Sequence, residues 1–266
     1  MSARCPWLAV VSCALIAAGA LRCTTDEPET PESFDTPSCY FSTARALVVD
    51  AAYEPGAEPY AGTGAGGGQT WSLLAGNLDS LVACHTQIDT VAVPRELAAM
   101  QALPVQNRAT WSVQAIVQLA DAHRPRLFSA DTGVFWIAFV NGYYDRGGTA
   151  DSGVIGVSLS GTGVIAVFKD VVERAAATEA VRRFVEQSTL VHEMGHALGM
   201  VNNPVPPLTA HEDPSHARHC SDQDCIMYWA NEGIIDLAGF AQRYLTSGRT
   251  VLFCGACRGD ICAYRP

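Results

Sequence analysis

The sequence contains few charged residues, and acidic ones outnumber basic ones. Charged residues make up 17% of the 266 residues, and the formal net charge is −10. No basic stripe is present to neutralise phosphate groups, which argues against a protein that binds nucleic acid. The same lack argues against electrostatic attachment to a membrane surface. With 48% hydrophobic residues, the chain is apolar and long enough to build one substantial globular domain.

Only the N-terminus has a long apolar run. Arg4 is followed by uncharged, mostly apolar residues from 6 to 20, and Ala18-Gly19-Ala20 fits a small-x-small cleavage site. We predict a signal peptide over residues 1–20, hence a secreted or extracytoplasmic protein. An uncleaved anchor and a lipoprotein modified on Cys23 stay open, and these are the only expected links to a membrane. The acidic, proline-rich residues 21–39 are predicted to be a linker or tether, and residues 40–266 the folded domain.

No internal repeat is present, and no Gly-Lys-Ser/Thr follows the glycine-rich stretch near residue 65, so that stretch is interpreted as a loop rather than a phosphate cradle. Helical and extended patterns alternate elsewhere. The alternation predicts an α/β (α+β) fold in which helices cover a mixed, twisted sheet. Strands are expected over 44–53, 88–94 and 133–144 and on both sides of the turn at 160–163, and helices over 71–85 and 109–124.

A further helix is predicted from residue 178 to residue 199, and it contains the motif His-Glu-x-x-His. His192 and His196 lie four residues apart, so both imidazoles can reach one zinc ion from the same face of the helix. Glu193 is rotated by roughly 100° from His192, which puts its carboxylate beside the metal. That is the position of a base that takes a proton from a zinc-bound water. Gly199 is expected to end the helix in a left-handed turn.

These residues resemble a known family. His192, Glu193, His196 and Gly199 match the start of the metzincin motif, and "HCSDQDCIMYW" (219–229) resembles the His-Cys-x4-Cys-x-Met segment of archaemetzincins. The resemblance implies a metzincin-like zincin fold, in which a Met-turn at Met227 and a C-terminal helix follow the motif helix. It also implies a second, structural zinc held by Cys220, Cys225, Cys254 and Cys257.

The third histidine of the motif is displaced. Metzincins place it three residues after the glycine, where this chain has Asn202, and a proline-rich insertion separates Gly199 from His219. If the insertion loops out, His219 can return to the metal. His211 and His216 are the alternatives, and a neutral amide at Asn202 would be a weak zinc ligand.

The cysteines allow two interpretations. The resemblance favours a structural zinc on Cys220, Cys225, Cys254 and Cys257, whereas export favours disulfides among the same residues. We rank disulfides slightly ahead, with Cys39–Cys84 as a further pair and Cys262 as the odd thiol. Tyr228, which follows Met227, is interpreted as a core or rim residue rather than as a donor to a reaction intermediate.

The expected function is that of a zinc metalloendopeptidase acting on a peptide or protein substrate, with Glu193 as the catalytic base and His192, His196 and His219 as ligands. The strands near residues 154–168 precede the motif helix, where metzincins place the edge strand that binds extended substrate. The alternatives are a non-catalytic, zinc-containing peptide- or protein-binding module of the same fold, and a hydrolase of a non-peptide amide.

Overall fold

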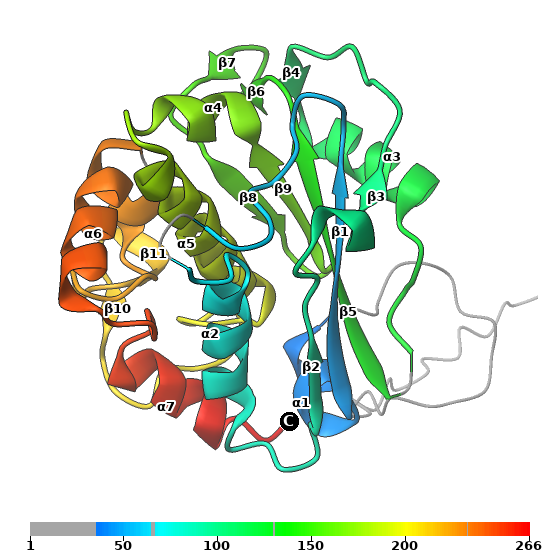
Figure 1. Ribbon diagram of the computed structural model, residues 1–266. Helices are drawn as coiled ribbons and strands as arrows, with labels where there is room; N and C mark the ends of the chain where they lie inside the picture. The colour runs from blue at the N-terminus through cyan, green and yellow to red at the C-terminus, as the bar shows by residue number, and fades with distance from the viewer. Residues whose placement is uncertain (1–35, 65–66, 130, 233) are drawn as a thin grey trace, which may run out of the picture.

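The structure is a computed structural model, and it describes residues 36–64, 67–129, 131–232 and 234–266 (Figure 1). The predicted signal peptide and nearly all of the predicted linker therefore lie outside the described residues. Helix α1 (Pro37–Ser42) begins within the last residues of the predicted linker and buries Pro37 and Cys39. Within the described residues, no helix is long and apolar enough to cross a membrane.

A twisted mixed sheet forms the centre of the domain. Its strand order is β2-β1-β5-β9-β8, with β3 paired beside β2 on β1. All pairings are parallel except that of β8, which runs antiparallel to β9 and forms one edge. The strands are β1 (Ala46–Tyr53), β2 (Thr90–Ala92), β3 (Gln101–Ala102), β5 (Thr132–Val140), β8 (Gly156–Leu159) and β9 (Val164–Phe168).

Helices cover both faces of this sheet (Figure 1). Helices α2 (Ser72–Val82) and α5 (Glu179–Ala197) pack together on one face, and α3 (Val113–His123) lies on the other. A small sheet lies beyond the main one and consists of β4 (Thr110–Trp111), β6 (Tyr143–Asp145) and β7 (Ala150–Asp151). The remaining elements are η1 (Leu97–Ala99), α4 (Lys169–Arg174), β10 (Glu212–Asp213), β11 (His216–Cys220), η2 (Trp229–Glu232), α6 (Ile234–Ser247) and α7 (Gly255–Ala263).

The prediction of a mixed α/β fold is confirmed, with three differences in detail. The helix predicted over 109–124 begins only at Val113, because Thr110–Trp111 forms β4. The strand predicted over 133–144 is two strands, because Gly142 adopts φ +87° between β5 and β6. An added Cβ there would lie 2.5 Å from the carbonyl oxygen of Ala109, so the close approach also requires glycine. The single expected C-terminal helix is two helices, and α6 occupies the long spacing between Met227 and Cys254.

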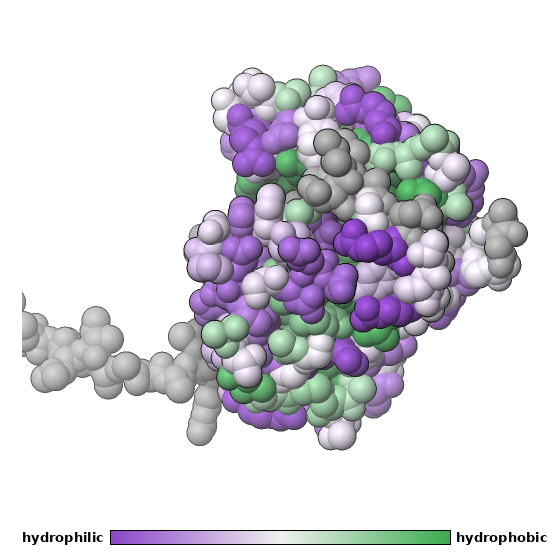
Figure 2. Space-filling model, turned by 90° about the vertical axis from the view of Figure 1, so that its left-hand side faces the viewer, coloured by the Kyte–Doolittle hydropathy of each residue, from purple (hydrophilic) through white to green (hydrophobic). Residues whose placement is uncertain are grey.

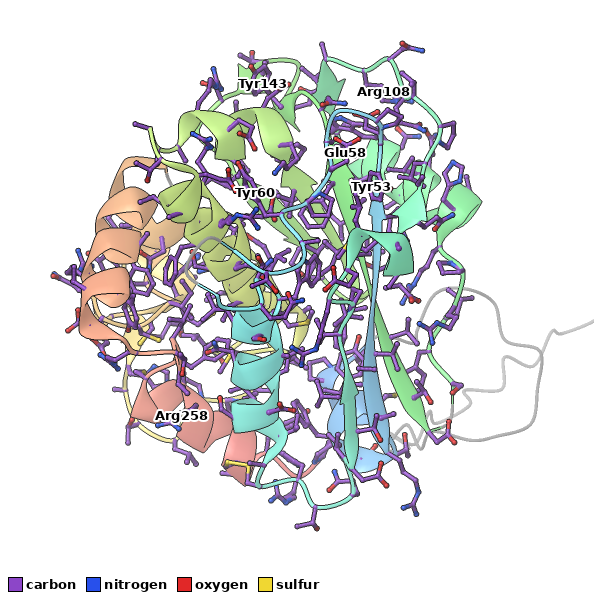
Figure 3. All side chains as sticks on the ribbon, viewed as in Figure 1. Tyr53, Glu58, Tyr60, Arg108, Tyr143 and Arg258 are labelled. Carbon is purple, nitrogen blue, oxygen red and sulfur yellow. A yellow bond between two sulfur atoms is a disulfide. The ribbon has the colours of Figure 1, made fainter. Side chains whose placement is uncertain are left out.

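One disulfide joins the C-terminal helix to the rest of the domain. Cys84, which follows α2, is bonded to Cys262 on α7 (Figure 3). The predicted Cys39–Cys84 pair and the unpaired Cys262 are therefore wrong. The physical reason is packing: α2 lies against α7, whereas Cys39 is buried in α1.

The surface is mixed in character. On the face shown in Figure 2, hydrophilic side chains gather across the middle of the molecule and hydrophobic ones are scattered among them. The apolar residues are instead concentrated between the sheet and its helices, where Trp71, Trp136 and Phe139 are fully buried. This core holds α5 in place.

A buried ion pair also anchors α5. Lys169, the only lysine of the sequence, contacts Glu186 of α5 at 2.6 Å, and Glu186 is fully buried. The backbone N–H of Tyr60 donates to the same carboxylate, and the Lys169 ammonium lies 4.0 Å from the centre of the Tyr60 ring. Burial raises the pKa of Glu186 to about 7, and Lys169 opposes that rise. The ion pair therefore offsets the cost of a carboxylate in the core.

We predict that Lys169→Met lowers the free energy of unfolding by about 3–5 kcal/mol, because it leaves a buried carboxylate without its partner. Glu173→Gln is the matched control. Glu173 contacts the same ammonium at 3.2 Å but is half-exposed, so its loss should cost less than about 1 kcal/mol. Denaturant unfolding measures both.

The loss of unfolding free energy caused by Lys169→Met should depend on pH. A carboxyl whose pKa is raised in the folded state above its ordinary value of 4.5 favours folding when protonated, so its contribution is lost as pH rises. The deficit should be small at pH 5 and should grow up to pH 8. A deficit that is equal at both pH values would contradict this assignment to Glu186.

Candidate metal centre

Helix α5 presents His192, Glu193 and His196 to the interior of the domain. It spans Glu179–Ala197, with Thr178 before it and Leu198 after it, which matches the predicted helix to within two residues. Gly199 follows with φ +84°, and an added Cβ there would lie 2.5 Å from Pro37 of α1. The left-handed turn and the packing of α1 therefore both require glycine at this position.

His219 joins the two helix histidines. The three residues offer one ligand atom each, and these atoms all lie within 4.8 Å of one another. The Nε2 atoms of His192 and His196 are 3.1 Å apart, close to the roughly 3.3 Å expected for two imidazoles on a tetrahedral zinc. The Nδ1 atoms of His192 and His219 lie 2.7 Å and 3.0 Å from backbone carbonyls of Ile226 and Ala217. These contacts engage Nδ1, so that Nε2 of both rings can face a metal.

The rival histidines lie elsewhere. Nε2 of His211 lies 2.5 Å from a carboxylate oxygen of Asp260, and its Nδ1 lies 3.5 Å from the sulfur of Cys220. His216 stacks on Trp229 with 4.0 Å between ring centres. Neither ring belongs to the three-histidine group, so His219 is the candidate third ligand.

Strand β11 brings His219 to this position. It pairs with β10, and the pairing is interrupted by a bulge at Glu212 and Asp213. Arg218 adopts φ +68° in β11, and its backbone N–H donates to Glu212. A bulge of this kind changes the direction of the side chains around it. The insertion that the sequence suggested as a simple loop therefore contains an irregular hairpin, whose second strand carries the candidate ligand.

Met227 packs beneath the histidines, as a Met-turn would. It is fully buried, and its backbone carbonyl accepts from the N–H of Cys220. A Cβ added to Gly195 would lie 2.4 Å from the Met227 sulfur. Gly195, between the two helix histidines, therefore makes the space for the methionine. Sequence reasoning missed this residue, although a glycine in the middle of a helix is a signal that another group approaches closely.

The four cysteines form a second group of donors. The sulfurs of Cys220 and Cys254 are 3.8 Å apart and those of Cys225 and Cys257 are 3.6 Å apart. Tetrahedral zinc with four thiolates requires about 3.8 Å between sulfurs, whereas a disulfide requires about 2.05 Å. All four are free thiols within 4.8 Å of one another. The geometry therefore fits zinc, and the disulfides that we ranked ahead do not form.

The thiols of the cysteine cluster differ in pKa. Contacts with Cys225 and then Cys257 lower the pKa of Cys220 to about 7, although the contact with Cys254 opposes the change. Contacts led by that with Cys220 lower the pKa of Cys254. A thiolate is the form that binds zinc. The His211 ring lies against this cluster and is held by Asp260, which also accepts from the N–H of Leu208. The insertion is thus attached to the cysteine cluster through His211. Zn²⁺ is the cofactor that both donor groups support.

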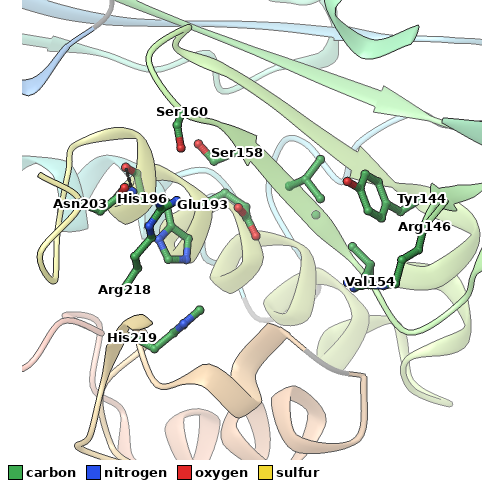
Figure 4. Close-up of a pocket in the computed structure, with 12 residues that line it drawn as sticks. Tyr144, Arg146, Val154, Ser158, Ser160, Glu193, His196, Asn203, Arg218 and His219 are labelled. Atoms are coloured by element: carbon green, nitrogen blue, oxygen red, sulfur yellow. Dashed lines mark hydrogen bonds between the residues drawn. The ribbon is translucent and has the colours of Figure 1, made fainter. Parts of the chain in front are cut away.

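A cleft of about 330 Å³ opens beside the three histidines (Figure 4). Glu193, His196 and His219 line it, and so do Gly156 and Ser158 of the edge strand β8. A Cβ on Gly156 would lie 2.7 Å from Thr189 and 3.2 Å from Glu193, so this glycine lets α5 approach the edge strand. Tyr228 does not line the cleft.

The chain is similar in structure to two solved proteins. One is an archaemetzincin from Archaeoglobus fulgidus, solved as a complex with malonate, at 15% identity and a TM-score of 0.40, covering 81% of this chain and 99% of that one. The other is a zinc-dependent peptidase from Methanocorpusculum labreanum, at 14% identity and a TM-score of 0.41, covering 80% of this chain and 99% of that one. No protein-family model and no curated protein matches the chain. TM-scores below 0.5 describe a loose overlap, which does not decide what this chain does.

We predict that Gly195→Ala displaces Met227 and lowers the free energy of unfolding by about 1–3 kcal/mol, because the added methyl overfills the core. Gly76→Ala on α2 is the control. Nothing lies within 4 Å of an added Cβ there, so it should stabilise the helix by roughly 0.5–1 kcal/mol. Thermal unfolding in the presence of zinc compares them. Equal stability of the two variants would contradict the close packing at Gly195.

We predict that the wild-type chain binds two zinc ions and that His219→Ala keeps only the one on the cysteines. His216→Ala should keep both, because its ring stacks on Trp229. Metal analysis by mass spectrometry, with competition against a chromogenic chelator, measures stoichiometry and affinity. Loss of a zinc ion in His216→Ala together with full retention in His219→Ala would reverse our assignment of the third ligand.

Proposed function

We propose that this chain is a zinc metalloendopeptidase, with His192, His196 and His219 as the ligands of the catalytic metal. The observation that carries the proposal is the position of Glu193. Its carboxylate lines the cleft beside the three histidines and close to the edge strand, where a bound peptide would lie (Figure 4). A zinc ion at the three histidines supplies a Lewis acid and lowers the pKa of water that it binds.

Glu193 performs the proton transfers in this proposal. It takes a proton from the attacking water and passes that proton to the leaving amine. Its placement is supported by the packing of α5 under Gly156, since any larger residue at 156 would move the carboxylate. The hydrogen bonds on Nδ1 of His192 and His219 keep both rings oriented through the reaction.

The edge strand β8 is the proposed binding site for the substrate backbone. β8 pairs only with β9 among the described strands, so its other side can pair with an extended peptide backbone. Residues line the cleft on both sides of Glu193, with Tyr144 and Val154 on one side and Asn203 on the other (Figure 4). A substrate can therefore continue in both directions, which favours cleavage inside a chain over removal of an end residue.

Two other functions compete with this proposal. A binding module of the same fold would use the cleft without hydrolysis, and a hydrolase of non-peptide amides would use the same base. The carboxylate at Glu193 argues against the first, because binding alone does not need a proton acceptor there. Export is also part of the proposal. It is supported by the predicted signal peptide and by the Cys84–Cys262 disulfide, since disulfides persist in oxidising compartments.

We predict that Glu193→Ala keeps zinc and fold but lowers peptide hydrolysis by about 10²–10⁴-fold, because no other base replaces it. Glu179→Gln is the control on the same helix. It is exposed and pairs with Arg183, so hydrolysis should stay within about twofold of wild type. An unbiased peptide mixture, with products identified by mass spectrometry, measures both. Activity of Glu193→Ala within a few-fold of wild type would refute the proposed base, and an inactive wild type with bound zinc would favour the binding module.

A further inference from the structure

One end of the cleft carries an unpaired positive charge. Arg146 and Arg218 both line the cleft, but Arg146 forms an ion pair with Asp151 at 2.7 Å. Within the described part of the chain, the guanidinium of Arg218 has neither a salt bridge nor a hydrogen bond. Among the residues that the structure describes, Glu193 is the only acidic one that lines the cleft. The Arg218 side chain is exposed, so it gives this end of the cleft a positive charge that a ligand can reach, in a protein with a net charge of −10.

The backbone at Arg218 adds to the argument. Its φ of +68° lies in the left-handed region, which costs an arginine roughly 1–2 kcal/mol that a glycine would not incur. The bulge could therefore be formed at lower cost by another residue. Strain of this kind is a reason to look for a function of the side chain.

Ser158 of the edge strand β8 also lines the cleft. Its hydroxyl oxygen is itself buried against the protein, so Ser158 marks the position of the edge strand beside the cleft and does not reach a ligand. In Figure 4, Ser158 and Arg218 both lie on the side of Glu193 that includes Asn203, opposite Tyr144.

The proton transfer by Glu193 indicates which half of the substrate lies on this side of the cleft. Glu193 delivers its proton to the leaving amine, which begins the C-terminal half of the substrate. In Figure 4 the Glu193 carboxylate lies between His196 and Tyr144, so the C-terminal half extends toward Tyr144. The N-terminal half then lies along Ser158, Asn203 and Arg218.

We propose that Arg218 forms a carboxylate-binding subsite, which selects peptides with an aspartate or glutamate on the N-terminal side of the cleaved bond. This inference rests on the proposed function and names its substrate class. Arginine binds a carboxylate through two parallel hydrogen bonds. The zinc charge nearby adds to the attraction.

The test compares acidic with neutral isosteres. Peptide libraries carry either glutamate or glutamine at each position around the cleaved bond, and cleavage is measured in low salt for the zinc-loaded protein. Wild type should cleave the glutamate peptide about 3- to 10-fold faster at one position N-terminal to the bond, and the ratio should fall in high salt. In Arg218→Gln and Arg218→Gly the ratio should fall to about one.

The variants separate recognition from stability. Arg218→Gly relieves the left-handed backbone, so its unfolding midpoint should not fall, and a lost ratio cannot then be assigned to misfolding. Arg146→Gln, at the opposite end of the cleft, and Arg258→Gln, an exposed residue of α7, should both keep the wild-type ratio. A wild type that cleaves both peptides equally, or an Arg218→Gln variant that keeps the preference, would overturn the subsite and leave the peptidase intact.

A binding measurement covers the case in which wild type hydrolyses nothing. Fluorescein-labelled glutamate and glutamine peptides are titrated with zinc-loaded wild-type and Arg218→Gln protein, and anisotropy reports the dissociation constants. Tighter binding of the glutamate peptide that depends on Arg218 would support the subsite while the proposed hydrolysis fails. Equal binding of the two peptides, or no binding, would overturn the subsite as well.

Discussion

The geometry of the candidate catalytic site depends on one short segment, residues 219–227. It supplies the candidate third ligand His219, two cysteines of the second cluster, and Met227 beneath the histidines. The carbonyl of Ile226 in the same segment accepts from His192 and so orients a ligand on α5. Because His219 and Cys220 are neighbours in the chain, a shift at the cysteine cluster moves the histidine. The positions of the three histidines and of the four cysteines are therefore coupled through this segment.

Helix α5 is the rigid partner of that segment. Most of its second half is buried, including polar side chains such as Glu186, Gln187 and Ser188. Burying these groups is costly unless each is paired, and Lys169 and the Tyr60 backbone provide partners for Glu186. The two glycines at 156 and 195 then let the edge strand and Met227 approach the helix closely. Side-chain volume at these two positions sets the distance between base, ligands and substrate strand.

Local patterns predicted the parts of the fold that local physics determines. The 3.6-residue periodicity placed α5 to within two residues, and alternation with β-branched runs found β1, β5, β8 and β9. Cysteine pairing was not predictable in this way, because it depends on which helices pack together. Cys84 meets Cys262 only because α2 lies against α7. The choice among His211, His216 and His219 likewise depended on a bulged hairpin inside the insertion, and bulges leave little signal in a single sequence.

The length of the insertion has a calculable cost. In the compact motif five residues separate the second and third histidines, whereas 22 residues separate His196 from His219 here. Closing the longer loop costs roughly 1.3 kcal/mol more in chain entropy. One or two hydrogen bonds stabilise a folded protein by about the same amount, and the insertion makes several. Asn202 donates to Glu212, Asn203 donates to the carbonyl of His196, and His211 is bound to Asp260. These contacts offset the added entropy, so a displaced third ligand is no less well held than one that follows the helix directly.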